Sequence, residues 1–332
     1  MNSTFCKLLT ILTVVAASGF AFKGDKYSNR QCTGEDQMPA GYSKTARINV
    51  DGDWDFFLTG SFILWQPSEQ GCEVAYTSGK LVNMDFDFKP GFKVGLGMNF
   101  NHDNWNLYAE YTRLNMTDRK SAHGSAITSP WMVNALASCT SASAKWELDY
   151  NMFTLQLARP YYVGTELTFT PHIGWKSGWI DQNYNVDYSA TNAPHSFNSN
   201  DSWLVGTRAG INTNWMLGRG VRLFGNGALA LFYQHFNTET TQYDTDGTYD
   251  LHASSKVGHT VPNMELGFGF GWGTYFARNQ WHFDVSGAYE YQIYWNQNYM
   301  RAMLHTIADV QSEGCAGDLS MQGLTLTFRF DF

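Results

Sequence analysis

Charged residues are scarce in this 332-residue sequence, in which Asp, Glu, Lys and Arg together make up 16%. An ordinary soluble domain carries about 25%. Aromatic residues also reach 16%, and the mean hydropathy of −0.33 excludes a helical membrane protein. Few charges, many aromatics and moderate polarity are typical of a membrane β-barrel, whose wall contacts lipid on the outside and water on the inside. The length suits either two soluble domains or one barrel.

Basic clusters and long apolar segments are lacking as well. The net charge is −8 and Lys and Arg do not cluster, which excludes the electrostatic footprint of a nucleic-acid-binding protein. The apolar run Leu8–Ala17 is far shorter than the ~20 residues of a membrane-spanning helix. With Lys7 before it and the small residues of Gly19–Ala21 after it, this run predicts a signal peptide over residues 1–21. If the protein resides in a membrane, strands must place it there.

Cysteines are few and widely spaced. Removal of the signal peptide removes Cys6 and leaves Cys32, Cys72, Cys139 and Cys315. The lack of any CxxC argues against zinc and redox motifs, so we expect no metal and no other cofactor. An exported protein can oxidise these thiols, and two disulfides with three possible connectivities are plausible. A disulfide between external loops would gate a pore mouth or, as we favour, simply stabilise the loops.

Period-two alternation of apolar and polar residues recurs from Trp54 to the C-terminus. In residues 92–100, Phe, Val, Leu, Met and Phe alternate with Lys, Gly, Gly and Asn, and residues 324–332 repeat the pattern up to Phe332. About ten such runs occur, most of them long enough for the ~9–11 residues that cross a bilayer at a tilt. An even number suits a closed antiparallel barrel without an exposed edge. The predicted fold class is all-β, an antiparallel transmembrane barrel of about 10 strands (range 8–16) over residues 54–332.

Two details of the pattern carry further expectations. In residues 146–159 the apolar parity switches between Met152 and Phe153, where we expect a β-bulge that re-aims the side chains. Tryptophans fall near the strand ends, where an aromatic girdle would lie. These are Trp54, Trp65, Trp105, Trp146, Trp203, Trp215, Trp281 and Trp295.

The connections between the runs alternate in length. Short ones are expected near 101–104, 160–165, 217–220 and 277–280, and long ones near 66–88, 115–145, 181–201, 237–258 and 296–318. Short periplasmic turns and long extracellular loops are the outer-membrane arrangement. With an even number of strands, this arrangement puts both chain termini on the periplasmic side. A short helix fits the loop from 297 to 310. Residues 22–53 form a polar N-terminal segment that stays periplasmic or enters the lumen as a plug.

The polar strand face is the predicted pore lining and carries charges of both signs. It consists of Lys93, Glu110, His172, Lys176, Arg208, Asn212, Arg222, Glu265, Asp284, Glu290, Arg329 and Asp331. Facing opposite charges either pair across the interior or form opposed rows that orient polar solutes, and both arrangements stay open. Eight-stranded barrels are filled by side chains and sixteen-stranded ones leave an aqueous channel. Ten strands therefore predict a narrow lumen.

Three segments resemble a known family. They are Trp54–Glu73 (WDFFLTGSFILWQPSEQGCE), Asp85–Leu114 (DFDFKPGFKVGLGMNFNHDNWNLYAEYTRL) and Trp146–Gln182 with its PHIGWKSGWIDQ ending. They are similar to the major outer membrane proteins of the Legionella type and their chlamydial relatives, over about Trp54 to Phe332. The resemblance implies a pore-forming, often surface-exposed and antigenic protein. The aromatic Phe332 resembles the signal by which barrels are recognised for assembly. The sequence has fewer cysteines than many chlamydial members, which argues against a disulfide-crosslinked envelope.

Enzymatic motifs are weak. The glycines of Gly267–Gly273 fall on every second residue of a strand and lack the Lys-Ser/Thr of a phosphate loop, so a row of small residues facing the lumen is the better interpretation. The acids of Asp244–Asp250 fail the EF-hand pattern. With His235, His252 and His259 they could do general acid–base work, but no second loop supplies a partner. We expect no enzyme.

The sequence thus predicts a Gram-negative outer-membrane porin for passive diffusion of ions or small solutes through a narrow mixed-charge lumen. The alternative is a structural or adhesive surface barrel with a plugged lumen, whose long loops bind host partners. The expected partners are outer-membrane lipid, the barrel-assembly machinery through the C-terminal strand, small solutes or ions, and host surface molecules. No nucleic acid is expected, and oligomer formation stays open. The expected location is the bacterial cell outer membrane.

Overall fold

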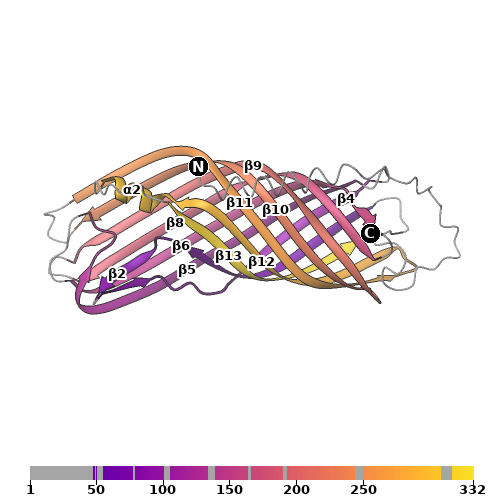
Figure 1. Ribbon diagram of the computed structural model, residues 1–332, viewed down its shortest axis with the longest axis horizontal. Coiled ribbons are helices and arrows are strands. Elements are labelled where there is room, and N and C mark those ends of the chain that lie inside the picture. Colours follow the sequence, from indigo (N-terminus) through magenta and orange to yellow (C-terminus); the bar gives the residue numbers. More distant parts are fainter. Residues whose placement is uncertain are drawn as a thin grey trace. The chain divides into compact units, whose positions relative to one another are not determined.

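In the computed structural model, the described residues are 48, 50, 55–77, 79–100, 105–133, 139–163, 166–189, 193–243, 250–307 and 316–332. Ten antiparallel strands in this part of the chain close into a barrel (Figure 1). They are β1 (Phe56–Glu69), β4 (Lys89–Asn99), β5 (Asn106–Thr128), β6 (Cys139–Ala158), β8 (Leu167–Ser189), β9 (His195–Gly218), β10 (Val221–Tyr243), β11 (Asp250–Phe276), β12 (Trp281–Asn298) and β13 (Gly317–Asp331). The predicted fold class is confirmed. The predicted signal peptide and almost all of the 22–53 segment lie outside the described residues.

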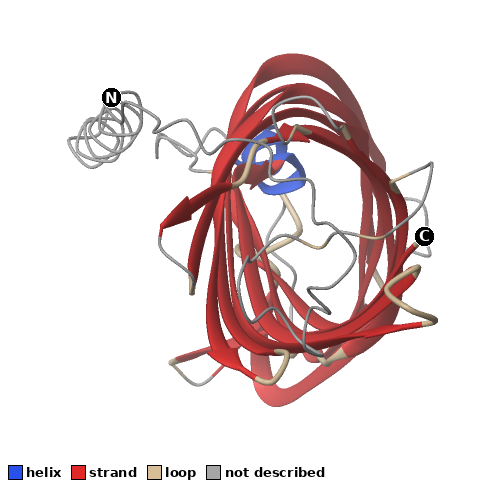
Figure 2. Ribbon diagram, turned by 90° about the vertical axis from the view of Figure 1, so that its right-hand side faces the viewer, coloured by secondary structure: helices blue, strands red, loops and turns tan. Residues whose placement is uncertain are grey.

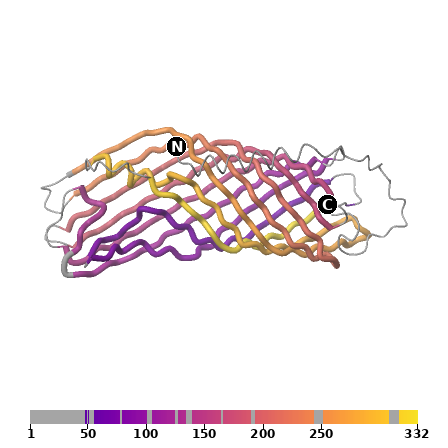
Figure 3. Tube along the Cα trace, viewed as in Figure 1, coloured from indigo at the N-terminus to yellow at the C-terminus, as the bar shows by residue number. Residues whose placement is uncertain are grey.

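The last strand closes the barrel on the first. β1 and β13 pair in continuous register from Phe57 opposite Asp331 to Glu69 opposite Leu319. Phe332 continues this pairing, because its backbone N–H donates to the carbonyl of Phe56 at 3.0 Å and its carbonyl accepts from the Phe56 N–H at 3.2 Å. The ring of hydrogen bonds therefore has no open edge. The start of β1 and the C-terminal residue lie at the same end of the barrel, as predicted. Figure 3 shows the strands running obliquely past one another.

Four shorter elements lie in the connections. The β1–β4 connection contains a hairpin of β2 (Glu73–Thr77) and β3 (Lys80–Asn83), and β7 (Tyr161–Val163) precedes β8. The β12–β13 connection contains the expected short helix, α2 (Tyr299–Ile307), which lies within the ring of strands in Figure 2. Over the described ranges, no helix combines the length and apolarity needed to cross a membrane.

The strand β8 shows how the outer surface changes along the barrel. Up to Trp179 its outward side chains are apolar and exposed, with Ile173 at 62% and Trp179 at 60%. Its inward side chains in this part are polar and buried, among them His172 and Lys176. Beyond Trp179 the pattern reverses. The outward residues become Asp181, Asn183, Asn185 and Asp187, and the inward ones include Ile180, Tyr184, Val186 and Tyr188.

The same reversal explains the parity switch in β6. Met152 is buried inside the barrel and Phe153 is exposed outside, but the pairing of β6 with β5 and β8 continues without a shift across both residues. The predicted bulge is therefore wrong. A strand that leaves lipid needs a polar outer face, and a closed interior beyond the membrane needs apolar filling. The switch marks the level at which the strand passes from lipid to water.

The strands continue into the long connections. The alternation of short and long connections is confirmed, but β5–β6, β8–β9 and β10–β11 are joined only by 129–138, 190–194 and 244–249. In these three connections, the remaining residues that were expected to be loop are regular strand. Its outward residues are polar, and this made the strand extensions resemble loops in the sequence.

Aromatic side chains mark both borders of the outward apolar band. At the outer border Trp179 lies opposite Trp203, whose ring stacks on His235 at 5.9 Å between centroids. At the periplasmic border the ring of Phe330 lies 5.0 Å from Trp281 and 6.1 Å from Phe332. Among the predicted girdle residues, those exposed on the outside are Trp203, Trp215 and Trp281.

Two of the predicted girdle tryptophans belong to the interior. Trp65 and Trp146 are buried inside the barrel, so their assignment to the girdle is wrong. Both follow the reversed parity of the extracellular half, where large apolar residues point inward. Trp105 and Trp295 are half-buried, and Trp54 lies outside the described residues.

Arginine substitutions on β8 test the position of the lipid boundary. Ile173→Arg puts a charge into the apolar band and should lower the free energy of unfolding by about 2–4 kcal/mol. Asn183→Arg, on the same outward face but above Trp179, should change it by less than about 0.5 kcal/mol. Urea unfolding of the refolded barrel in lipid vesicles, followed by tryptophan fluorescence, measures both. Equal losses for the two variants would contradict this boundary.

Candidate functional site in the barrel interior

The twelve predicted lining residues all face the barrel interior. Ten of them line two cavities, while His172 and Asp331 are buried in the wall beside them. We call the first, of about 200 Å³ and bordered by Trp65, Tyr150 and Met321, the central cavity. The second, of about 370 Å³, reaches the strand ends at the periplasmic rim and is called the periplasmic cavity.

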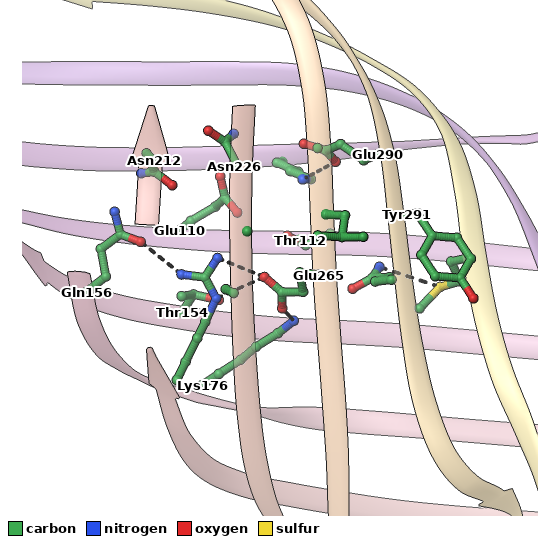
Figure 4. A pocket seen from close by; sticks show the side chains of 18 of the residues that line it. Glu110, Thr112, Thr154, Gln156, Lys176, Asn212, Asn226, Glu265, Glu290 and Tyr291 are labelled. Atoms are coloured by element: carbon green, nitrogen blue, oxygen red, sulfur yellow. Dashed lines mark hydrogen bonds and ion pairs between the residues drawn. The ribbon is translucent and has the colours of Figure 1, made fainter. Parts of the chain in front are cut away.

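Charges around the central cavity pair across the interior. Glu265 on β11 accepts a hydrogen bond from Lys176 Nζ on β8 at 2.5 Å (Figure 4). Its other oxygen accepts from Arg208 Nη2 on β9 at 2.8 Å, and Arg208 also donates to the Gln156 side-chain oxygen at 3.0 Å. A second pair joins Lys93 and Glu290 at 2.7 Å. Two cations thus share the Glu265 carboxylate, and Lys93 and Glu290 neutralise each other.

Most charges of the periplasmic cavity are paired with an opposite charge. Arg222 and Asp284 form an ion pair between β10 and β12, with one Nη2–Oδ1 distance of 2.7 Å. Arg329 binds Asp331 through Nε at 2.9 Å, and Asp331 also contacts His282 at 2.9 Å. Glu110 accepts a hydrogen bond from the Tyr108 hydroxyl at 2.9 Å.

The glycine row of β11 makes room for one of these pairs. Gly271 lies opposite Arg222 and Gly273 lies opposite Asp284, so the ion pair crosses β11 over the two glycines. A Cβ on Gly271 would lie 2.7 Å from Arg222 Cζ, and one on Gly273 would lie 3.0 Å from Asp284 Oδ2. Close approach of flanking side chains is therefore the physical reason for glycine here.

Above the central cavity, buried apolar and aromatic side chains occupy much of the interior, and β9 and β10 add buried polar side chains such as Asn198, Asn200 and Gln242. The Tyr150 and Tyr294 hydroxyls meet at 2.8 Å at the lower border of this region. The hairpin β2–β3 contributes Val74 and Ala75, and α2 contributes Met300 and Leu304, all buried. We call this region the extracellular seal, formed by the described residues Val74, Ala75, Trp131, Trp146, Leu148, Tyr150, Tyr184, Val186, Tyr188, Tyr294, Met300 and Leu304.

One arginine of α2 connects three external segments within the seal. Arg301 donates from Nη1 to the carbonyl of Pro130 at 2.6 Å and lies over the Trp131 ring at 5.3 Å. Its Nη2 is 3.6 Å from a carboxylate oxygen of Glu73. The residues before β6, the β2–β3 hairpin and α2 are thereby held together. This arrangement could not be read from the sequence, because the three segments are far apart in the chain.

A family model described as "Legionella pneumophila major outer membrane protein precursor" matches residues 48–332. This chain belongs to that family. Its location is accordingly the bacterial outer membrane. No curated protein sequence matches the chain.

Some solved outer-membrane proteins are similar to this chain at low identity. The outer membrane protease OmpT from Escherichia coli is 11% identical, with a TM-score of 0.45 over 86% of this chain and 99% of that one. The attachment invasion locus protein Ail of Yersinia pestis is 10% identical, with a TM-score of 0.25 over 85% and 100%. A Pseudomonas aeruginosa FadL homologue is 7% identical, with a TM-score of 0.28 over 89% and 99%. None of these likenesses supports an activity for this family member.

The cysteines and the candidate enzymatic residues do not build a site in the described part of this major outer membrane protein. Cys72 and Cys139 are buried free thiols, and Cys32 and Cys315 lie outside the described residues. His235 packs outward on Trp203, whereas the His259 ring stacks inside on Phe236 at 4.8 Å. Residues 244–249 are not described. No group of three or more His, Cys, Asp or Glu suited to a metal occurs among the described residues.

A buried carboxyl lies in the outer part of the interior, above the lipid boundary. Glu69 is 3% exposed and accepts a hydrogen bond from Gln182 Nε2 at 3.1 Å. Burial disfavours the charged form, so the pKa of Glu69 lies well above its ordinary value of 4.5. Burial likewise raises the pKa of the Cys72 thiol, which keeps it protonated and unreactive.

Removing the central carboxylate tests the ion pairs. Glu265→Gln leaves Lys176 and Arg208 without their counter-charge, and loss of one partner of a buried pair costs about 3 kcal/mol. The exposed, outward Glu239→Gln is the matched control and should change stability by less than about 0.5 kcal/mol. Urea unfolding in vesicles gives both numbers. A stability of Glu265→Gln equal to that of the control would show that the interior charges are solvated rather than paired.

Because Glu69 is buried, the stability of the folded barrel should depend on pH. Because the folded-state pKa of Glu69 is raised, the neutral form is favoured, so the protein loses stability as pH rises from the ordinary pKa through the folded-state pKa. Glu69→Gln should therefore unfold at a higher temperature than the wild type at pH values above that window, with no difference below it. Thermal unfolding of both proteins across the pH range measures this. A wild type more stable at high pH would contradict the assignment.

Proposed function

We propose that this protein is a surface barrel with a sealed lumen, which presents a rigid polar wall outside the cell, rather than an open diffusion pore. The observation that supports this is the extracellular seal, a cluster of buried apolar and aromatic side chains contributed by the strands, the hairpin β2–β3 and α2. Trp131, Trp146 and Tyr184 in it are completely buried. Water and ions cross a barrel only through a hydrated path. The filled outer half leaves such a path only if the seal moves.

The outer wall is suited to contacts with partners. The ten residues Ile180–Ser189 rise about 3.3 Å each, which at a tilt of about 40° extends the wall roughly 25 Å beyond the aromatic border. Hydrogen-bonded strands make this wall stiff, and a filled interior keeps it from collapsing. Polar outward side chains on β5, β6, β8, β9 and β10 make it a surface that stays soluble until a partner binds.

The partners of this proposal belong to three classes. Outer-membrane lipid contacts the apolar band, and the barrel-assembly machinery reads the C-terminal strand that ends in Phe332. Host surface molecules bind the wall and the external connections. The proposal gives the protein no catalytic activity, in keeping with a family described as a major outer membrane protein.

Passive diffusion is the second candidate function, favoured by the two cavities in the membrane half. They would form the inner part of a pathway if the hairpin β2–β3 and α2 left the lumen. The two functions therefore differ in one property, which is whether the seal is closed at rest.

Planar-bilayer conductance separates the two functions. The wild type should give no steady single-channel steps. A variant in which short Gly-Ser linkers replace residues 70–88 and 299–316 removes both the hairpin and α2 from the seal and should conduct. A heat-modifiable gel shift must show that both barrels are folded. Regular conductance steps from the wild type would contradict the sealed-lumen proposal and favour passive diffusion as the function.

Adhesion of cells that display the protein tests the wall. The outward triple variant Asp181→Lys/Asp201→Lys/Glu239→Lys reverses charges on three neighbouring strands and should reduce adhesion to host cells several-fold. The lumen variant Gln156→Ala is the control and should adhere like the wild type. Unchanged adhesion of the triple variant at equal surface display would argue against a binding role for this wall.

A further inference from the structure

The periplasmic cavity has one wall made of uncharged polar side chains. It consists of Thr168 and Thr170 on β8, Asn212 and Asn214 on β9, and Asn226 on β10. These residues are cross-strand neighbours, since Thr170 lies opposite Asn212 and Asn212 lies opposite Asn226. Figure 4 shows Asn212 and Asn226 side by side on adjacent strands. We call this surface the amide wall.

A hydroxyl-bearing wall faces the amide wall. β1 is five strands away from β9 in either direction around the ten-stranded ring, so the two lie on opposite sides. On this side Ser61 and Thr327 share a hydrogen bond of 2.8 Å, and Thr59 bonds to the Tyr108 hydroxyl at 2.7 Å. The ring of Phe57 stacks on Tyr108 at 5.6 Å and adds an aromatic surface to the same cavity.

Most charge in this cavity lies in neutral pairs. Arg222 is paired with Asp284, Lys93 with Glu290 and Arg329 with Asp331. Glu110 is the exception, because its carboxylate accepts a hydrogen bond from the Tyr108 hydroxyl. An anionic ligand would therefore have to separate a pair or remain without a counter-charge, and either is costly in a partly desolvated site. The amides and hydroxyls both donate and accept hydrogen bonds. The cavity therefore favours ligands that are polar but uncharged.

One polar group of the amide wall also lacks a partner. The Thr168 hydroxyl oxygen is buried and has no hydrogen-bond partner in the structure, although Thr168 is only 3% exposed. Buried hydroxyls nearly always have a partner, so a bound molecule or an ordered water is expected here.

We propose that the periplasmic cavity binds an uncharged polyhydroxylated small molecule of mono- to disaccharide size. Its volume of about 370 Å³ lies at the lower end of ordinary ligand pockets, about 300–1,000 Å³. Sugar hydroxyls match the amide and hydroxyl walls, because both partners donate and accept hydrogen bonds. The inference goes beyond the proposed function. The seal would block the passage of a solute to the outside, whereas the side chains of the periplasmic cavity would select the solute that binds.

Calorimetric titration of the refolded barrel in lipid nanodiscs tests the proposal, and sugar-based detergents must be absent. Trehalose and maltose should bind with millimolar dissociation constants, whereas gluconate should bind at least tenfold more weakly. The double variant Asn214→Leu/Asn226→Leu should weaken disaccharide binding at least tenfold, about 1.4 kcal/mol. The outward double variant Asn183→Leu/Asn185→Leu is the matched control and should bind like the wild type.

Three outcomes would overturn the proposal. They are no heat of binding with either disaccharide, equal binding of gluconate, and disaccharide binding that survives Asn214→Leu/Asn226→Leu in a barrel that passes the heat-modifiable gel shift. The titration is repeated on the barrel with residues 70–88 and 299–316 replaced, in which binding should persist. Because that variant opens the seal without touching the cavity, failure of sugar binding is distinguishable from failure of the sealed-lumen proposal.

Discussion

The pairing of β13 with β1 is the interaction on which the rest of the structure depends. In lipid every backbone N–H and C=O must find a partner within the protein, so a sheet crosses a membrane only when its two edges join. The register between Phe57 and Glu69 on β1 and their partners on β13 joins them, up to the C-terminal residue. Closure creates the interior, and an interior of ten strands is narrow enough for opposite walls to interact.

Each long strand passes through two environments, lipid in the membrane half and water beyond it. In the membrane half, lipid outside selects apolar outward residues, and the inward residues form a wet, charge-balanced lumen. Beyond Trp179 and Trp203, water outside selects polar outward residues, and the interior must be filled to keep the extended walls apart. A hairpin and a helix from two external connections supply much of this filling. The extracellular seal is thus a consequence of strands that are longer than the membrane requires.

The interior chemistry follows from pairs that meet across strands. Glycines on β11 bring Arg222 and Asp284 together, and Glu265 lies within reach of two cations from β8 and β9. Because these charges neutralise one another, the uncharged amide wall sets the polarity of the periplasmic cavity. The proposed seal in the outer half and the proposed ligand site in the inner half are therefore separate properties of one barrel.

The sequence by itself determined an antiparallel barrel of about ten strands and the face of each strand that meets lipid, because a period of two fixes the facing of every residue within one environment. It misjudged Trp65, Trp146 and the parity switch at Met152 and Phe153. The reason is that apolar residues face outward where the strand contacts lipid and inward where it contacts water. Only the tertiary structure decided which charges pair and what fills the lumen. Those contacts join residues such as Glu73, Pro130 and Arg301, whose proximity depends on the closure of the ring rather than on any local pattern.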